Sequence, residues 1–224
     1  GEAGGGLPGV HKLDRTDSKQ VKLSEKVSIA KAVPIPPGVS LSGIHSQHRF
    51  VPVPTIRVGV VKKHWAGISK PLAQHLKLQV RMNLQASQVE LRTCGLTRDA
   101  SAVDRGADFV KAVVIGFTIQ DALSLLRLDN IYIKSFDITD VKELKGDHLS
   151  RAIGRLAGTK GRTRQGIEVS TRTRIVLADH RVHILGSNDS VRQATKVVTD
   201  LILGRPTSKA NKVLRAISGR LRSE

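Results

Sequence analysis

The chain has 224 residues, with 37 Lys and Arg against 19 Asp and Glu, so its formal net charge at pH 7 is +18. This excess predicts a polyanionic partner, nucleic acid before an anionic membrane, and no apolar run approaches the about 20 residues that span a bilayer. Aromatic residues are only 3% of the chain, which excludes modules that stack bases on aromatic strands, such as RRM sheets and OB barrels. The single cysteine, Cys94, excludes an intrachain disulfide framework, and the apolar run around it predicts a buried core thiol.

Residues 1–55 are predicted to form a flexible tail. Gly4-Gly5-Gly6 and a series of prolines interrupt this stretch, which shows little apolar periodicity. The same composition is compatible with an arm that becomes ordered on a partner. Positive charge increases along the chain, from a net +3 in residues 1–55 to +5 in residues 56–145 and +10 in residues 146–224.

Residues 56–129 are predicted to form a first folded unit. Apolar residues alternate in its expected strands and recur at helical spacing in its expected helices. The expected elements are a strand at Ile56–Val60, a helix over Lys63–His75 with a break near Ser69–Pro71, strands at Leu78–Leu84 and Val89–Thr93, a helix over Ala100–Phe117, and a helix over Asp121–Leu128.

Residues 130–224 are predicted to form a second unit with the same order of elements. Gly204 and Pro206 are typical of the end of its long helix. The expected elements are a strand at Ile131–Phe136, a helix over Gly146–Ala157, a loop at Gly158–Gly161, a second helix, strands at Thr171–Leu177 and Arg181–Leu185, a helix from Asn188 or Ser190 to Gly204, and a last helix over Ser208–Leu221.

The two units are predicted to be copies of one pattern. Four pairs of identical residues share a separation of 88 residues: Gly116 with Gly204, Ala122 with Ala210, Leu126 with Leu214, and Arg127 with Arg215. A fixed offset between two β-α-α-β-β-α patterns indicates an internal repeat. This order predicts an α+β fold, with antiparallel strands and helices on one face of each sheet.

The loop Gly158-Thr159-Lys160-Gly161 is the strongest functional signal in the chain. Its glycines let the backbone approach a ligand, and the start of the next helix suits a phosphate. A helix, a Gly-x-x-Gly loop and a second helix form the nucleic-acid clamp of KH domains. Alone, such a loop is more often an ordinary helix end, but its place between the two helices of this repeat favours the clamp. A P-loop is disfavoured because Lys160 precedes the second glycine instead of following it.

The first copy of the repeat departs from this pattern. Its corresponding loop is predicted at Gly67-Ile68-Ser69-Lys70-Pro71, where the second glycine is replaced and a proline follows. We expect this copy to keep the KH fold with a weakened phosphate clamp, and to serve in packing or in protein contact.

The predicted RNA-binding residues lie on the first helix, the loop, the second helix and the following strand. Arg172 and Arg174 are expected on one face of that strand, where lining the groove and stabilising the sheet surface are equally open roles. The full set is Arg151, Arg155, Gly158, Thr159, Lys160, Gly161, Arg162, Thr163, Arg164, Arg172 and Arg174.

No catalytic site, metal site or cofactor is predicted. His180 and His183 lie near Asp179, but no cysteine or further carboxylate completes a metal-ligand pattern. Asp147 beside His148 fits a helix start. A nuclease or nucleotide hydrolase is therefore disfavoured, and the chain is not expected to be an enzyme.

Several long motifs closely resemble a known family. They are His148–Arg155 with the loop that follows, Thr171–Asp179, Ala107–Ala112, Leu201–Gly204 with Pro206, Ser135–Lys142 and Val89–Cys94. The chain resembles the KH family called partner of the Nob endonuclease, or Dim-two, from about Val51 to Ser218. The loop departs from the Gly-Lys-Gly-Gly that is usual in the family.

The resemblance implies two tandem type I KH domains, the first of them degenerate, in a non-enzymatic assembly factor of the small ribosomal subunit. Its implied partners are the 3′ region of precursor small-subunit rRNA, the Nob endonuclease, small-subunit ribosomal proteins and other assembly factors. The implied location is the nucleolus and nucleus, with passage to the cytoplasm. A KH-type regulator of messenger RNA and a structural ribosomal protein stay open as alternatives.

Overall fold

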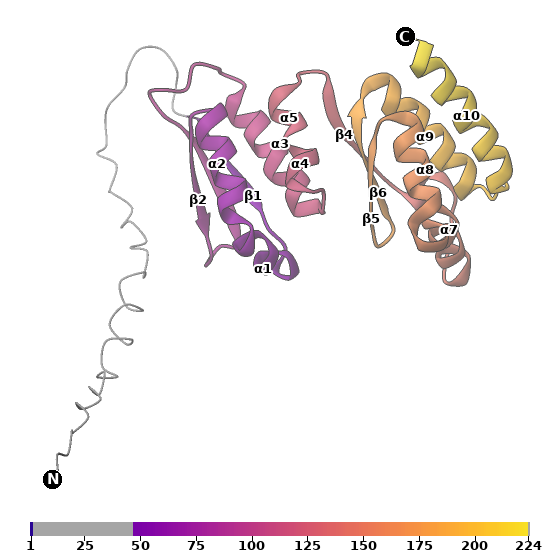
Figure 1. Cartoon of the computed structure of the whole chain (residues 1–224), viewed down its shortest axis with the longest axis horizontal. Coiled ribbons are helices and arrows are strands. Elements are labelled where there is room, and N and C mark those ends of the chain that lie inside the picture. The colour runs from indigo at the N-terminus through magenta and orange to yellow at the C-terminus, as the bar shows by residue number, and fades with distance from the viewer. Residues whose placement is uncertain (2–46, 224) are drawn as a thin grey trace. The chain divides into compact units, whose positions relative to one another are not determined.

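The computed structural model describes residue 1 and residues 47–223 (Figure 1). Most of the predicted flexible tail therefore lies outside the described residues. Within them, none of the helices is both long and apolar enough to cross a bilayer.

The first unit contains a three-stranded antiparallel sheet in the order β1-β3-β2. Its elements are β1 (His48–Pro52), α1 (Thr55–Lys63), α2 (Trp65–His75), β2 (Leu78–Asn83), β3 (Gln88–Thr93), α3 (Ala102–Ile115), α4 (Ile119–Ala122) and α5 (Ser124–Arg127). Alternate residues of β3 are buried, and they share one core with Ile68 and Leu72 of α2 and Phe109 of α3. The helices therefore cover one face of this sheet.

The second unit repeats the arrangement, with the sheet order β4-β6-β5. Its elements are β4 (Ile131–Asp137), α6 (Ile138–Val141), α7 (Asp147–Ala157), the 3-10 turn η1 (Thr159–Gly161), α8 (Arg162–Thr171), β5 (Arg174–Ala178), β6 (Arg181–Ser187), α9 (Asn188–Ile202) and α10 (Thr207–Ser223). Val182 and Ile184 of β6 join a core with α7, α8 and α9. The predicted α+β fold, with two tandem β-α-α-β-β-α units, is confirmed.

The repeat extends beyond the KH order into the helices that follow it. The segment after α3 packs back on α3, as α10 packs on α9. Ala122 and Leu126 are buried in the first unit, and their counterparts Ala210 and Leu214 are buried in the second. The offset seen in the sequence therefore marks equivalent packing positions.

The first unit begins earlier than predicted. Its first strand is β1, within the range expected for the tail, and the predicted strand at Ile56–Val60 is wrong because these residues lie in α1. Val53 N–H donates to Ser87 O at 2.8 Å, so the nitrogen of the preceding Pro52 points away from the sheet. An edge strand tolerates proline there because no ladder hydrogen bond is lost.

The predicted break near Ser69–Pro71 is also wrong. The chain bends at His64, between α1 and α2, and Pro71 lies inside α2. Leu72 is fully buried beside it, so packing outweighs the single backbone hydrogen bond that proline removes. The position equivalent to the Gly-x-x-Gly loop is therefore occupied by Lys62, Lys63 and His64, and not by Gly67–Pro71.

Two smaller predictions also differ from the structure. Cys94 follows β3 and is half-buried, and its Sγ–H donates to Lys77 O at 2.9 Å, so it is not a core thiol. The helix predicted over Asp121–Leu128 is two short helices, α4 and α5.

The two units share apolar contacts. Leu185 of β6 is only 3% exposed, yet it belongs to the core of the first unit, and Val176 of β5 and Ile131 and Ile133 of β4 pack against that core. These side chains lie on the face of the second sheet opposite Val182 and Ile184. The second sheet is therefore covered by its own helices on one face and by the first unit on part of the other.

Candidate nucleic-acid interface

Helix α7 ends at a position that only glycine can occupy. Gly158 has φ 71° and ψ 173°, a conformation that is essentially restricted to glycine. A Cβ placed on Gly158 would lie 2.7 Å from Thr163 Cβ and 2.8 Å from Thr163 N, so the loop folds tightly over the start of α8. Gly161 N–H donates to Gly158 O at 3.1 Å and closes the turn.

The start of α8 faces out of this loop with concentrated positive charge. Lys160 (φ 55°) and Gly161 (φ 76°) both have left-handed backbones, and Gly161 is the N-cap of a ten-residue helix. The first N–H groups of a helix lack intrahelical partners and attract anions. Lys160, Arg162 and Arg164 are exposed around them. This geometry suits a backbone phosphate.

Arg155 makes a structural contact that the sequence did not predict. Its Nε–H donates to Leu201 O at 3.2 Å, and its Nη2 donates to Ile202 O at 3.5 Å. These carbonyls lie at the end of α9, where a cation is favourable. Arg57 of α1 binds the end of α3 in the same way, through Val114 O and Val113 O. Arg151, in contrast, is exposed on α7.

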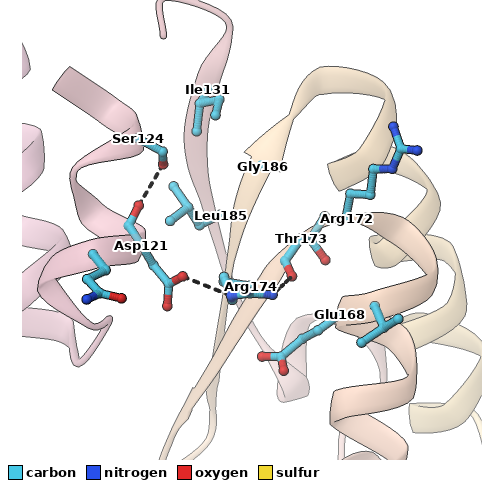
Figure 2. Close-up of a pocket in the computed structure, with 11 residues that line it drawn as sticks. Asp121, Ser124, Ile131, Glu168, Arg172, Thr173, Arg174, Leu185 and Gly186 are labelled. Atoms are coloured by element: carbon cyan, nitrogen blue, oxygen red, sulfur yellow. Dashed lines mark hydrogen bonds and ion pairs between the residues drawn. The ribbon is translucent and has the colours of Figure 1, made fainter. Parts of the chain in front are cut away.

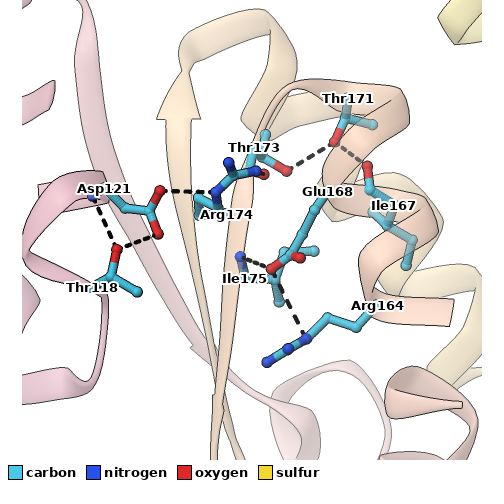
Figure 3. A network of polar contacts seen from close by, with 9 residues as sticks. All are labelled: Thr118, Asp121, Arg164, Ile167, Glu168, Thr171, Thr173, Arg174 and Ile175. Carbon is cyan, nitrogen blue, oxygen red and sulfur yellow. Dashed lines mark hydrogen bonds and ion pairs between the residues drawn. The ribbon is translucent and has the colours of Figure 1, made fainter. Parts of the chain in front are cut away.

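Glu168 links α8 to β5, the edge strand of the sheet (Figure 3). Its Oε1 accepts a hydrogen bond from Ile175 N at 2.8 Å, and Arg164 Nε lies 3.9 Å from the same atom. The Glu168 side chain is only 14% exposed, whereas that of Arg164 is 44% exposed. Arg164 therefore stays accessible near the loop while Glu168 holds the strand.

Arg172 and Arg174 do not alternate along one strand, because β5 begins at Arg174. Arg172 is the C-cap of α8, with φ 52°. Arg174 Nε–H donates to Asp121 Oδ1 at 2.9 Å, and its Nη1 donates to Thr173 O at 3.4 Å (Figure 2). Thr118 Oγ1 donates to the other oxygen of Asp121 at 2.8 Å. Arg174 is thus tied to the first unit.

A hollow of about 420 Å³ opens beside Arg174 (Figure 2). Residues of α4 and α5 form one side of it, and residues of α8 and β5 form the other. Its lining includes Gln120, Asp121, Ser124, Glu168, Val169 and Arg174. Sequence analysis missed the acidic members of this set. Thr118-x-x-Asp121 is a recognisable helix-start motif, but its spacing carries no information about a partner 53 residues later.

His183 is the one buried histidine among the described residues, at 7% exposure in β6. Its Nδ1 lies 2.6 Å from Ser135 Oγ. Burial lowers its pKa from the ordinary 6.5, Arg181 lowers the pKa further, and Asp137 opposes both. In the part of the chain that the structure describes, no three His, Cys, Asp or Glu side chains gather as a metal-binding group.

A family profile described as "Eukaryotic type KH-domain (KH-domain type I)" matches residues 135–219. The match runs from the end of β4 through most of α10 and includes the loop at Gly158–Gly161. It therefore falls on the unit with the phosphate-type loop.

Two named relatives are similar over most of the chain. The pre-rRNA-processing protein PNO1 of Debaryomyces hansenii is 48% identical over 207 residues, which cover 92% of this chain and 81% of the relative. The RNA-binding protein pno1 of Drosophila melanogaster is 52% identical over 176 residues, which cover 79% of this chain and 73% of the relative.

Solved archaeal structures share the fold. The crystal structure of Dim2p from Pyrococcus horikoshii has a TM-score of 0.67 and 26% identity, and the match covers 76% of this chain and 99% of that chain. A chain of the a/eIF2alpha–aDim2p–rRNA complex from the same organism has a TM-score of 0.69 and 25% identity, with coverage of 78% and 96%.

Proposed function

Because the chain belongs to the PNO1 family of RNA-binding, pre-rRNA-processing proteins, we propose that it binds the 3′ region of precursor small-subunit rRNA through its second KH domain. The observation that carries this proposal is the loop at Gly158–Gly161. It presents the N-terminus of α8 amid exposed basic side chains, which is the arrangement that grips an RNA backbone.

The proposed role is non-enzymatic. The protein holds the RNA and helps to position the Nob endonuclease near its cleavage site, together with small-subunit ribosomal proteins and other assembly factors. Its proposed path begins in nucleolar and nuclear precursors and ends in the cytoplasm. The related structure described as a complex of aDim2p with rRNA supports the RNA part of this proposal.

Binding of the full chain to an RNA that spans the 3′ end of small-subunit rRNA tests the proposal. The variant Thr159→Asp, Lys160→Asp should bind this RNA at least tenfold more weakly, because two carboxylates would face the phosphates. Thr207→Asp, Lys209→Asp is the matched control, since it makes the same change at exposed positions of α10. Equal binding by the wild type, the loop variant and the control would show that the RNA does not bind at the loop.

Cleavage of precursor RNA by purified Nob endonuclease tests the positioning role. Adding this protein should concentrate cleavage at the 3′ end of the small-subunit rRNA, and the Thr159→Asp, Lys160→Asp variant should not. An unchanged cleavage pattern would contradict the role. Recovery of messenger RNA by crosslinking would favour a messenger RNA regulator, and co-sedimentation with mature subunits would favour a structural ribosomal protein.

Blocking nuclear export of a fluorescently tagged chain tests the proposed path. The protein should accumulate in the nucleus and nucleolus, and it should return to the cytoplasm when the block is released. A distribution that does not respond to the block would contradict passage between the compartments.

A further inference from the structure

The hollow beside Arg174 lies at the opposite end of α8 from the Gly158–Gly161 loop. The loop meets α8 at Arg162, whereas Glu168, Val169 and Arg172 line the hollow near the end of the same helix. Ten helical residues span about 15 Å. A KH clamp holds about four nucleotides, so a strand that continues beyond them along α8 can reach this hollow.

Arg174 forms a fixed platform in the hollow. Its Nε–H donates a hydrogen bond to Asp121 of the first unit, and its Nη1 donates one to Thr173 O of the second unit. The edge of the guanidinium is therefore anchored from both units (Figure 2). The side chain nevertheless remains 53% exposed. A planar guanidinium stacks on RNA bases, and this one is already held in place, which reduces the entropy lost on binding.

The walls of the hollow suit the edge of a base. Asp121 and Glu168 supply carboxylate oxygens, which accept hydrogen bonds, and Gln120 supplies an amide that both donates and accepts. Val169 adds an apolar surface and is 69% exposed. Carboxylates favour bases with an exocyclic amino group and disfavour uracil, which has no such group and whose single N3–H donor lies between two carbonyl oxygens. The volume of about 420 Å³ is in the range of small-molecule sites.

We propose that this hollow binds one base of the RNA strand that the Gly158–Gly161 loop holds, stacked on the Arg174 guanidinium and read by Gln120, Asp121 and Glu168. The inference rests on the proposed RNA-binding function. It gives the first unit an RNA contact that does not require a glycine loop of its own. It also assigns the site a preference for adenine, cytosine or guanine over uracil.

Oligonucleotide binding to the full chain tests this site. The RNAs are derived from the 3′ end of small-subunit rRNA and extended one nucleotide at a time from four to eight. Affinity should rise by roughly five- to tenfold at the length that reaches the hollow, in keeping with one stacked base. Uracil at that position should abolish the increase.

Two variants locate the effect. Gln120→Ala removes an exposed amide and should lose the increase in affinity while binding the four-nucleotide RNA normally. Arg174→Lys keeps the charge beside Asp121 but lacks the planar group, and it should lose the same increase. Arg181→Lys is the matched control, since Arg181 is also an exposed strand arginine, 2.7 Å from Asp137. Gln74→Ala, at another exposed position of the first unit, is the control for the amide.

Photocrosslinking from 6-thioguanosine, moved through the RNA, identifies the contact directly. The expected crosslink lies in the tryptic peptide 112–127, which contains Gln120 and Asp121. Crosslinks confined to residues 151–164, with equal binding by Arg174→Lys and wild type, would overturn the site while leaving the proposed function intact. Failure of the wild-type chain to bind any of the RNAs would instead contradict the proposed function.

Discussion

Gly158 and Gly161 are alike in sequence but differ in what a side chain would meet. A Cβ on Gly158 would contact the backbone of Thr163, whereas a Cβ on Gly161 would have open space. Gly161→Ala should therefore cost only the about 1–2 kcal/mol of a left-handed alanine. Gly158→Ala should cost more than this and should distort the start of α8.

Chemical denaturation of the two variants measures this difference. Gly154→Ala is the reference, because Gly154 lies inside α7 with open space around it, and alanine there should stabilise the helix by about 0.5–1 kcal/mol. Equal losses for Gly158→Ala and Gly161→Ala would show that the loop adjusts at Thr163.

His183 should make stability depend on pH. Because burial lowers its pKa in the folded chain below the ordinary 6.5, the unfolded chain binds a proton more readily. The stability contributed by the neutral imidazole is complete above pH 6.5 and decreases as the pH falls below that value. Between pH 7.5 and 5, denaturation should show a decrease in the free energy of unfolding. His183→Asn should make this decrease smaller, whereas His180→Asn, the control at an exposed site, should leave it unchanged.

The sequence predicted which residues carry charge near the loop but not which of them are already bonded. Lys160 and Arg162 were placed correctly on the loop and at the start of α8, because glycine and helix-start patterns are local. Arg155 and Arg174 instead bind partners 46 and 53 residues away. Such partners depend on how helices and units pack, which no local spacing encodes.

At the scale of elements, Arg155 fastens α7 to the end of α9. Arg155→Ala removes the charged donor to two backbone carbonyls at the end of α9, so it should lower the free energy of unfolding by about 1–3 kcal/mol. Arg162 is exposed at the start of α8, so Arg162→Ala should change stability by less than about 0.5 kcal/mol.

The salt dependence of RNA binding separates these two roles. A phosphate contact to single-stranded RNA adds roughly 0.7 to the slope of log K against log salt. Arg162→Ala should lower the slope by about this amount, and Arg155→Ala should leave the slope unchanged even where its affinity falls. A lower slope for Arg155→Ala would show that Arg155 contacts an RNA phosphate.

Elements with one consistent period were predictable, and those with competing signals were not. β2, β3, α3 and α9 follow from alternating or helical patterns. In α1, the residues Ile56–Val60 alternate like a strand, but Val58 and Val61 pack inward at helical spacing. In β1 and the two residues after it, prolines resemble a linker, although Val51 and Val53 are buried. Tertiary packing decided both cases.

At the scale of the whole molecule, duplication produced two units with different surfaces. The second keeps glycines at its loop, whereas the first has Lys62, Lys63 and His64 there and offers α4, α5 and Gly116 at the end of α3 to the second sheet. The 88-residue offset revealed the duplication. It could not reveal this contact, because the outward residues of β5 and β6 have the same apolar character as a strand's ordinary core residues.

The shared apolar face should make the two units unfold together. Leu185 lies 3% exposed between them, so Leu185→Arg would bury a charge without a partner. Calorimetry of the wild-type chain should show one transition, and Leu185→Arg should show two, with faster trypsin cleavage after the exposed Arg127 that precedes β4. Leu203→Arg is the control, because Leu203 is 48% exposed on the second unit. Two transitions in the wild type would mean that this face is too weak to couple the units. In that case, an RNA that contacts both units would couple their unfolding, because it binds only when both are folded. Adding RNA should then merge the two transitions into one.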